Sequence, residues 1–305
     1  MSNRLIAVNA AAKSIGFSGQ RRPDGNILRI REGDPLASGL LFYAYDNGYG
    51  TGVTGAQIDQ AKFELINDSQ FYRFNVPYDF GPTVATLYGD AFYYNDDTAH
   101  RCPTPASIQA ATAAGNYTFA CAFIQIPVLT GRSPNPYARP FGRTAENGTT
   151  QPYTNWAFQI NEGGGGATNI SANVNNNGVQ GSTGEGTFVN GAYTTAVGVL
   201  NGGTLTLYIN GVASGTPKTG ITPASDNTND TILFSNSTAT GLSNMFQGVV
   251  FYGAFWGRPL SQDEVMSLHL NPYSFLTDAR QDLAFPLYVP SIPVSTQRFM
   301  FGGMI

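Results

Sequence analysis

Two stretches late in the chain decide the fold: residues 204–215 read TLTLYINGVASG, and residues 246–265 read FQGVVFYGAFWGRPLSQDEV. In the first stretch, leucine and isoleucine alternate with polar residues, which is the two-residue period of a strand with one buried face. The dipeptide Asn210-Gly211 follows directly, and it is a strong signal for a tight hairpin turn. The first stretch therefore predicts an antiparallel hairpin.

The second stretch predicts a strand that is buried on both sides. Its large apolar residues fall on both parities of the strand, with Val249, Phe251 and Phe255 on one face and Val250, Tyr252 and Trp256 on the other. A strand of this kind belongs in the middle of a packed structure.

A helix is predicted immediately after this strand. Ser261 and Glu264 have the spacing of a capping box, and Leu260 and Val265 are placed as a hydrophobic staple. The helix must end near Pro272, because the residue before a proline disfavours helical geometry. Elsewhere residues 55–66 suggest a second helix, so helix is a minor component.

The composition agrees with an all-β chain that has many turns. Its 305 residues include 36 Gly and 18 Pro, and charged residues make up 12%, about half the ~25% of ordinary soluble proteins. The net charge of −4 argues against nucleic-acid binding, which needs clustered Lys and Arg. So few surface charges protect poorly against self-association, and we expect a homo-oligomer.

Neither a membrane span nor a secretory signal is predicted. The most apolar run, residues 248–257, is about half the ~20 residues that a spanning helix needs. Near the N-terminus the apolar run of residues 5–8 is too short for the core of a signal peptide. We therefore expect a protein that is made in the cytoplasm and has no membrane partner.

The chain divides into three zones. Residues 1–36 are predicted to form an N-terminal arm, residues 37–276 carry the strand-like runs, and residues 277–305 form a C-terminal tail. Prolines exclude a regular helix in the tail. Its apolar end would be costly to leave in water. We expect it to anchor the protein on a neighbouring subunit through Phe299, Met300, Phe301 and Ile305.

The two late stretches resemble the laminin G-like branch of the concanavalin A-like families. Residues 204–215 resemble its strand–hairpin–strand segment, which reads close to L-x-L-Y-V-N-G-x-x-x-G. Residues 246–265 resemble its final strand and closing helix, which read F-x-G-x-I-x-x-V-x-x-Y-x-R-x-L-S-x-x-E-I, and residues 38–43 and 116–123 resemble earlier strands more loosely. The resemblance implies a concanavalin A-like antiparallel β-sandwich (jelly roll) with one short C-terminal helix and extended terminal arms.

Packing and turn motifs of this kind specify a fold and not a function. These families include lectin-like binders, polysaccharide-cleaving enzymes, adhesion modules and domains of bacteriophage virion proteins. This chain lacks a secretion signal and is rich in Asn, Gly and Thr, so it most resembles the last group. The resemblance thus implies a non-enzymatic protein of the virion surface, either a head decoration or a fibre subunit, with capsid or tail proteins as partners.

Two alternatives stay open. A glycan-cleaving enzyme needs a pair of carboxylates, and related enzymes place them as E-x-D-x-x-E. Here Glu32-Gly33-Asp34 lacks the third acidic residue, so we rank this alternative last. A lectin-like module for host-surface glycans would stack sugars on aromatic rings, although core or subunit packing also uses such rings; the candidates are Tyr93, Tyr94, Tyr153 and Trp156.

No cofactor or metal is expected. Residues 50–55 match G-x-G-x-x-G, but a dinucleotide site also needs a βαβ unit and an acidic partner. Metal-capable side chains gather in one loop, yet a zinc site needs more ligands within reach; these residues are Asp96, Asp97, His100 and Cys102. We expect a solvated turn there, and Cys121 to be a small buried hydrophobe beside Phe119 and Phe123.

Overall fold

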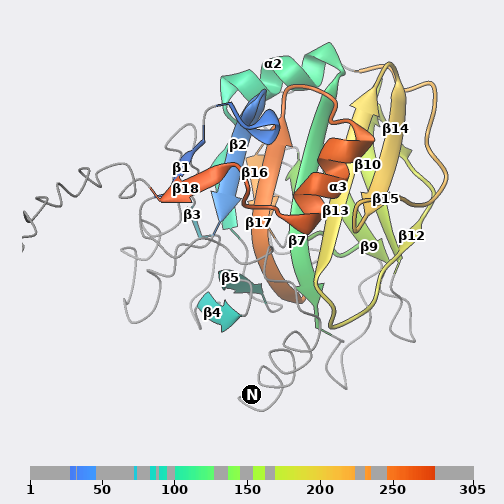
Figure 1. The fold of residues 1–305 in the computed structure, drawn as a ribbon. Coiled ribbons are helices and arrows are strands. Elements are labelled where there is room, and N and C mark those ends of the chain that lie inside the picture. The colour runs from blue at the N-terminus through green and yellow to red at the C-terminus, as the bar shows by residue number, and fades with distance from the viewer. Residues whose placement is uncertain are drawn as a thin grey trace, which may run out of the picture.

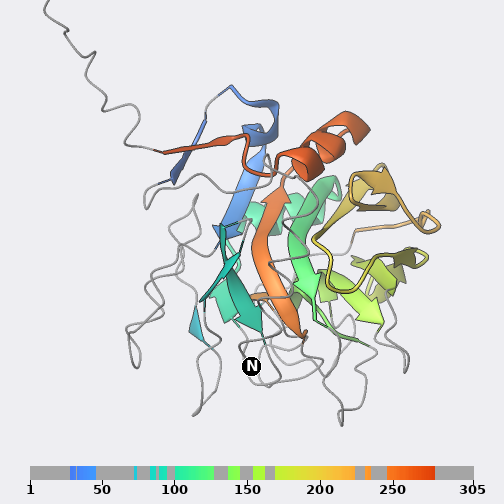
Figure 2. The same ribbon diagram turned by 60° about the horizontal axis from the view of Figure 1, so that its bottom comes forward.

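The protein is an antiparallel β-sandwich in which two large sheets face each other (Figures 1 and 2). The computed structural model describes residues 28–31, 33–45, 72–73, 83–86, 89–94, 100–126, 137–144, 154–161, 169–223, 231–234 and 246–278. Within these residues the chain forms mostly strands, together with two α-helices and one 3-10 turn. The predicted fold class is confirmed.

The first sheet, sheet I, has the strand order β15-β14-β13-β7-β17-β5-β4, and β2 lies beside β17 next to β5. Its two long central strands, β7 and β17, are fully buried along their lengths. The strands of sheet I are β2 (Leu40–Tyr45), β4 (Thr83–Thr86), β5 (Gly89–Tyr94), β7 (Tyr117–Gln125), β13 (Thr194–Asn201), β14 (Thr204–Ile209), β15 (Val212–Ala213) and β17 (Gly248–Trp256).

The second sheet, sheet II, has the order β11-β10-β9-β8-β16-β6-β3, and β12 also pairs with β10. All of its described pairings are antiparallel. The strands of sheet II are β3 (Tyr72–Arg73), β6 (His100–Pro103), β8 (Phe141–Thr144), β9 (Thr154–Asn161), β10 (Asn169–Asn176), β11 (Val179–Ser182), β12 (Gly186–Thr187) and β16 (Thr231–Phe234).

The predicted hairpin at residues 204–213 is present. Strand β14 buries every second residue, beginning at Leu205. Asn210 and Gly211 have φ angles of 52° and 81°, the left-handed conformations that a two-residue turn of this type needs. The Asn210 side chain also accepts a hydrogen bond of 3.0 Å from the backbone N–H of Thr195, so the turn is fastened to strand β13.

The core between the sheets is built on aromatic rings. Trp156 of β9 lies 5.4 Å from Phe119, 5.2 Å from Phe141 and 5.2 Å from Phe255, measured between ring centroids. Cys121 lies in the same cluster. It is a free, fully buried thiol whose pKa is raised by desolvation, so its predicted role as a small hydrophobe is confirmed.

Strand β17 is buried on both faces, as predicted, but the predicted assignment of residues to faces is wrong after Phe251. The register of β17 against β7 shifts between Val250 and Tyr252. Val250 and Phe255 therefore both pack between the sheets, whereas Phe251, Tyr252 and Trp256 pack outside sheet I. A bulge adds one residue to a strand and so moves every later side chain to the other face.

The outer side of sheet I is covered by segments from both ends of the sandwich. Helix α3 (Gln262–Leu270) and the 3-10 turn η2 (Pro35–Ala37) pack their apolar side chains on it. Strands β1 (Leu28–Ile30) and β18 (Leu276–Asp278) pair with each other beside them (Figure 1). Over β2, β7, β13 and β17 this face is therefore a second apolar core.

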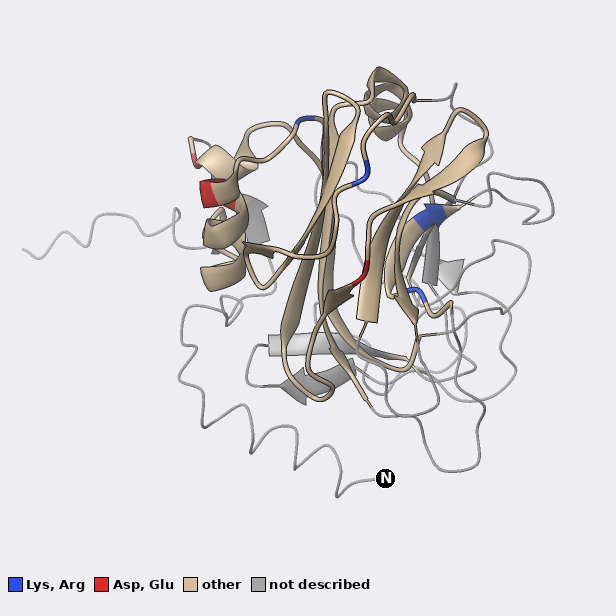
Figure 3. Ribbon diagram, turned by 90° about the vertical axis from the view of Figure 1, so that its right-hand side faces the viewer, with Lys and Arg blue, Asp and Glu red and all other residues tan. Residues whose placement is uncertain are grey.

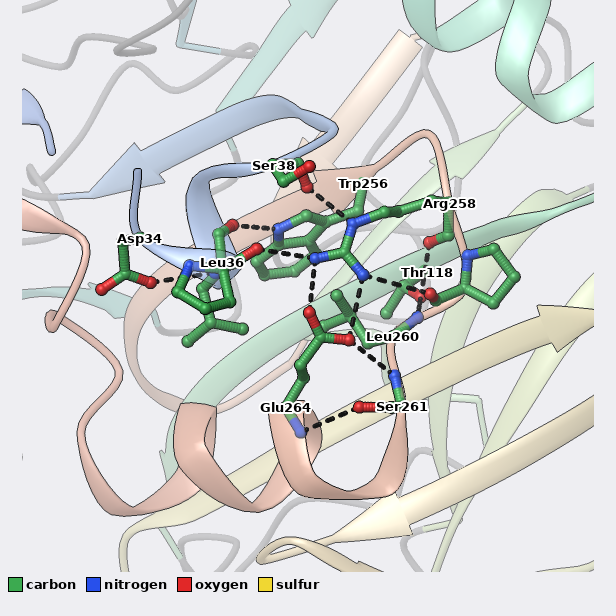
Figure 4. A network of polar contacts seen from close by, with 11 residues as sticks. Asp34, Leu36, Ser38, Thr118, Trp256, Arg258, Leu260, Ser261 and Glu264 are labelled. Carbon is green, nitrogen blue, oxygen red and sulfur yellow. Dashed lines mark hydrogen bonds and ion pairs between the residues drawn. The ribbon is translucent and has the colours of Figure 1, made fainter. Parts of the chain in front are cut away.

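A polar cluster fastens the N-terminal segment to strand β17 (Figure 4). The indole N–H of Trp256 donates to the backbone oxygen of Leu36 over 2.7 Å. Arg258 donates from Nε to the Ser38 oxygen and from Nη2 to the Pro35 oxygen, both at 2.7 Å. Residues 28–31 and 33–36, which the sequence analysis assigned to an arm, thus pack as part of the sandwich.

The C-terminal helix is confirmed with its capping box. The backbone N–H of Glu264 donates to the Ser261 hydroxyl, and the Glu264 carboxylate accepts from the Ser261 N–H. A second helix, α2 (Ala106–Ala114), was not predicted. It is alanine-rich and ends at Gly115 in a left-handed conformation, so propensity and C-cap signals for it were present in the sequence. The helix suggested at residues 55–66 lies outside the described residues.

Candidate functional site

The outer face of sheet II is polar, in contrast to the apolar outer face of sheet I. Alternate residues of β9 and β10 point into the core, beginning with Trp156 and Ile170. Apart from Ala157, the outward residues of these two strands carry amides or hydroxyls, and β11 adds two more. We call this set the amide face: Asn155, Gln159, Asn161, Asn169, Ser171, Asn173, Asn175, Gln180 and Ser182.

The amide face is organised by hydrogen bonds between side chains of neighbouring strands. Asn173 Nδ2 donates to Gln159 Oε1 over 3.3 Å, and Asn175 Nδ2 donates to Asn155 Oδ1 over 3.4 Å. Asn175 Oδ1 in turn accepts from the backbone N–H of Gly178 at 2.9 Å. Such bonds hold the amides in fixed orientations, so their remaining donors and acceptors form a set pattern.

The amide face has a buried floor and an exposed rim. Asn155 and Asn173 are 4% and 0% exposed, whereas Gln159 and Asn175 are partly exposed. Ser182, on the outermost strand β11, is exposed. A ligand that reaches this face would meet amides and hydroxyls at two depths.

One carboxylate lies at the end of the amide face. Glu185 Oε1 accepts from Asn161 Nδ2 over 3.2 Å, and its Oε2 accepts from Asn169 Nδ2 over 2.9 Å. Because these amides belong to neighbouring strands β9 and β10, the carboxylate joins the ends of both strands. Glu185 is exposed.

Arg139, just before strand β8, is a buried cation. Its side chain is 6% exposed, and its Nε and Nη1 atoms have no hydrogen-bond partner. Burial lowers the pKa of its guanidinium from the usual 12.5 to about 10. The other buried arginine of this region, Arg143, donates instead to the hydroxyls of Thr104 and Thr112, which ties sheet II to helix α2.

The aromatic platform expected for sugars is not formed as predicted. Tyr94 and Trp156 are 0% exposed and lie in the core between the sheets, so that assignment is wrong for these two residues. On β9, Asn155 and Gln159 are at the outward-facing positions, and Trp156 is at an inward-facing one. Tyr153 lies outside the described residues, and of Tyr93 only the backbone in β5 is described. The repeated amides of β9 and β10 were the signal that the sequence analysis missed.

The remaining predicted sites can be placed in part. His100 and Cys102 lie in strand β6 rather than in a turn, while Asp96 and Asp97 lie outside the described residues. Within the part of the chain that the structure describes, no three His, Cys, Asp or Glu residues lie close enough together to hold a metal. The anchor residues also lie outside it; they are Phe299, Met300, Phe301 and Ile305.

Acidic residues are sparse in the described parts of sheet II. None of its strands, as far as they are described, contains Asp or Glu, and Figure 3 shows few charged residues along the described ribbon. Of the acidic tripeptide at residues 32–34, Asp34 caps η2 by accepting a 2.9 Å hydrogen bond from the Leu36 N–H. The described strands of sheet II thus contain no carboxylate pair of the kind that glycoside hydrolysis needs.

Comparison with known proteins defines the class. The family described as the concanavalin A-like lectin/glucanases superfamily matches residues 95–266, more than half of the chain, and the protein belongs to this family. A search of curated proteins found no match. No helix in the described residues has the length and apolar character needed to cross a membrane.

Several solved structures share the fold at low sequence identity. The binding domain of botulinum neurotoxin DC, in complex with SialylT, matches with a TM-score of 0.52 and 11% identity over 76% of this chain and 51% of that chain. The binding domain of Paraclostridial Mosquitocidal Protein 1 gives 0.51 and 17% over 77% and 52%. Trypanosoma rangeli sialidase in complex with sialic acid gives 0.52 and 12% over 78% and 33%. This chain therefore spans about half the length of the two toxin domains and a third of the sialidase.

Proposed function

We propose that the protein binds carbohydrate through the amide face of sheet II and does not cleave it. The observation that carries this proposal is the row of cross-strand amides on β9 and β10, because the outer face of the other sheet is covered by apolar side chains over its central strands. Amide groups both donate and accept hydrogen bonds, as sugar hydroxyls do, and they need no charge to match them.

Two further observations support binding without catalysis. The solved neighbours include two toxin binding domains, one of them in complex with SialylT, so the same fold serves binding elsewhere. The described strands of sheet II carry no acidic residue, and a glycosidase needs one carboxyl as acid and another as nucleophile or base.

The test is a glycan array followed by calorimetry on the strongest hits. Gln159→Leu and Asn175→Leu should each weaken binding about tenfold, because a lost polar contact that leaves its partner desolvated costs about 1–3 kcal/mol. Asn201→Leu, which alters an exposed amide at the end of strand β13 in sheet I, is the matched control and should bind normally. A full array without a hit, or equal binding by all variants, would contradict the proposal.

A second proposal concerns where the protein acts. We infer that it is displayed on a bacteriophage particle as a head decoration or fibre subunit, made in the host cytoplasm and assembled as a homo-oligomer. The support is compositional: charged residues make up 12% of the chain, and an apolar segment with Phe299, Met300, Phe301 and Ile305 follows the sandwich. That segment is the proposed anchor on other virion proteins.

Mass spectrometry of gradient-purified particles tests this second proposal. A fixed ratio to the major capsid protein supports decoration, a few copies per particle support a fibre, and absence contradicts the proposal. A chain truncated after Asp278 keeps strand β18 paired with β1 and should fold but fail to incorporate. The full-length chain is its control, and normal incorporation of the truncated chain would contradict the anchor.

A further inference from the structure

Two unused hydrogen-bonding groups lie on either side of Gln159. An isolated bridge pairs Ala138 with Ile160, both of which pack in the core. The register of this bridge places Arg139 opposite Gln159. Because Ala138 and Phe141 both pack in the core, the chain bulges between them and leaves Arg139 and Pro140 on the outer side. On the other side of Gln159, Asn173 donates to it through Nδ2, while its buried Oδ1 has no partner.

The two groups are chemically complementary to one kind of ligand. Arg139 Nε and Nη1 and Asn173 Oδ1 are buried and have no hydrogen-bond partner. Asn173 lies opposite Ala157, two residues along the strand from Gln159. Since neighbouring strands lie about 4.8 Å apart and each residue advances a strand by about 3.4 Å, the backbones that carry Arg139 and Asn173 are about 12 Å apart. That span suits a sugar ring bearing an anionic group at one side and a hydroxyl at the other.

The charge of the site also calls for an anion. A buried guanidinium without a counter-ion is costly to desolvate, and the structure records no ion pair for Arg139. Glu185, the carboxylate at the end of the amide face, is held by Asn161 and Asn169 instead. The described strands of sheet II contain no acidic residue.

We propose that Arg139, Gln159 and Asn173 form a subsite for an acidic sugar. The Arg139 guanidinium receives the carboxylate, and Asn173 Oδ1 accepts a hydrogen bond from an adjacent hydroxyl of the same residue. Planar guanidinium groups recognise carboxylates through paired, charge-assisted hydrogen bonds. The inference rests on the proposed function, since it names the class of glycan that the amide face selects.

The charge needed for this role is present at neutral pH. Although burial lowers the pKa of Arg139, it remains at about 10, so the side chain is protonated where glycans would be bound. The proposed selectivity should therefore be constant across the neutral range.

The test compares ligands that differ only in charge. Oligogalacturonate and its methyl ester have the same ring and size, and sialyllactose and lactose form a second pair with a different acidic sugar. Calorimetry with the full chain should show about tenfold or more tighter binding of the acid in at least one pair, the size expected for hydrogen bonds to a charged group. The pair that shows the preference identifies the sugar as a uronate or a sialate.

Variants then assign the preference to the subsite. Arg139→Gln should abolish the acid preference while binding of the neutral partner persists, and Asn173→Leu should weaken both acid and neutral partner. Lys218→Gln removes a positive charge at an exposed position outside sheet II and should change neither. The Arg139→Gln change removes an uncompensated buried charge, so the variant should be at least as resistant to urea as the parent. If Arg139 had a purely structural role, the variant would be less resistant to urea than the parent.

The outcomes separate this inference from the proposed function. Equal binding of acid and neutral partner, or an acid preference that survives in Arg139→Gln, overturns the subsite and leaves glycan binding standing. Failure to bind any glycan overturns both. An acid preference lost in Arg139→Gln and kept in Lys218→Gln supports the subsite.

Discussion

Arg258 and Glu264 form a two-point ion pair, with Nη2 2.6 Å from Oε1 and Nη1 2.9 Å from Oε2 (Figure 4). The same arginine binds backbone oxygens of the N-terminal segment, and the same glutamate closes the capping box of helix α3. The hydrogen bond from Arg258 holds the pKa of Glu264 below its ordinary value. This pair thus connects the start of the sandwich to its last helix.

Replacing Glu264 should loosen this connection. Glu264→Ala removes one half of the capping box together with the ion pair, so we expect the free energy of unfolding to fall by about 1–2 kcal/mol, mostly from the cap because the pair is partly exposed. Asp263→Ala, in the same helical turn, is the control and should cost less. Urea unfolding followed by circular dichroism measures both, and equal losses would contradict the role assigned to Glu264.

Comparing the two tryptophans measures what the hydrogen bond from Trp256 to Leu36 contributes to stability. Both indoles are fully buried, but Trp256 Nε1 donates to the Leu36 oxygen, whereas Trp156 Nε1 has no partner. Both Trp→Phe changes lose volume, but only Trp256→Phe leaves a buried carbonyl without its donor. We expect it to destabilise the protein by about 1–3 kcal/mol more than Trp156→Phe in urea unfolding. The reverse order would show that the Leu36 contact contributes little.

Acid should destabilise the protein through His269. Burial lowers the pKa of His269 below its ordinary 6.5, so the unfolded chain takes up its proton first as the pH falls. The free energy of unfolding should therefore fall as the pH drops below 6.5 towards the folded-state pKa, and this contribution should be absent above about pH 7.

The substitution His269→Gln isolates this effect. It should flatten the dependence of the urea midpoint on pH between about pH 7 and pH 5, while an amide can still pair with the Thr195 hydroxyl, which lies 2.9 Å from His269 Nδ1. An unchanged slope in the variant would assign the acid sensitivity to other groups. Below that range, protonation of Glu264 should add a further loss, since its folded-state pKa is also lowered.

A substitution at Gly198 should show how closely the core is packed, through its effect on stability. A Cβ atom on this residue of β13 would overlap the ring of Phe119, so Gly198→Ala should cost about 1–3 kcal/mol of stability through overpacking. The double variant with Phe119→Leu should lose less than the sum of the single changes, because the smaller side chain leaves room. Additive losses in thermal unfolding would contradict this contact.

Local signals predicted the elements whose geometry depends on neighbouring residues in the sequence. The Asn210-Gly211 turn and the Ser261 and Glu264 capping box are of this kind, since each is set by the backbone of a few residues. The bulge at Phe251 is not, because it depends on how β17 pairs with β7 and leaves no mark in the hydrophobic pattern. Face assignment along β17 therefore could not be derived from sequence.

The candidate site was partly readable from the sequence. The alternation of Trp156, Phe158 and Ile160 placed these residues on one face, and in the structure that face is the core. Asn155, Gln159 and Asn161 of β9, and the polar residues at alternate positions of β10, then had to face outward. The position of Arg139, buried and without a hydrogen-bond partner on two of its nitrogens, could not be predicted from the sequence. It depends on a bridge between Ala138 and Ile160, which joins separate parts of the chain.

The pairing of β1 with β18 has a mechanical consequence. Leu28 lies opposite Asp278, so the chain enters and leaves the sandwich at the same point, through antiparallel strands of three residues each. Tension between the two ends would peel these strands apart one pair at a time, rather than load all their hydrogen bonds together. A force on either end would therefore reach the sandwich through this short pair of strands.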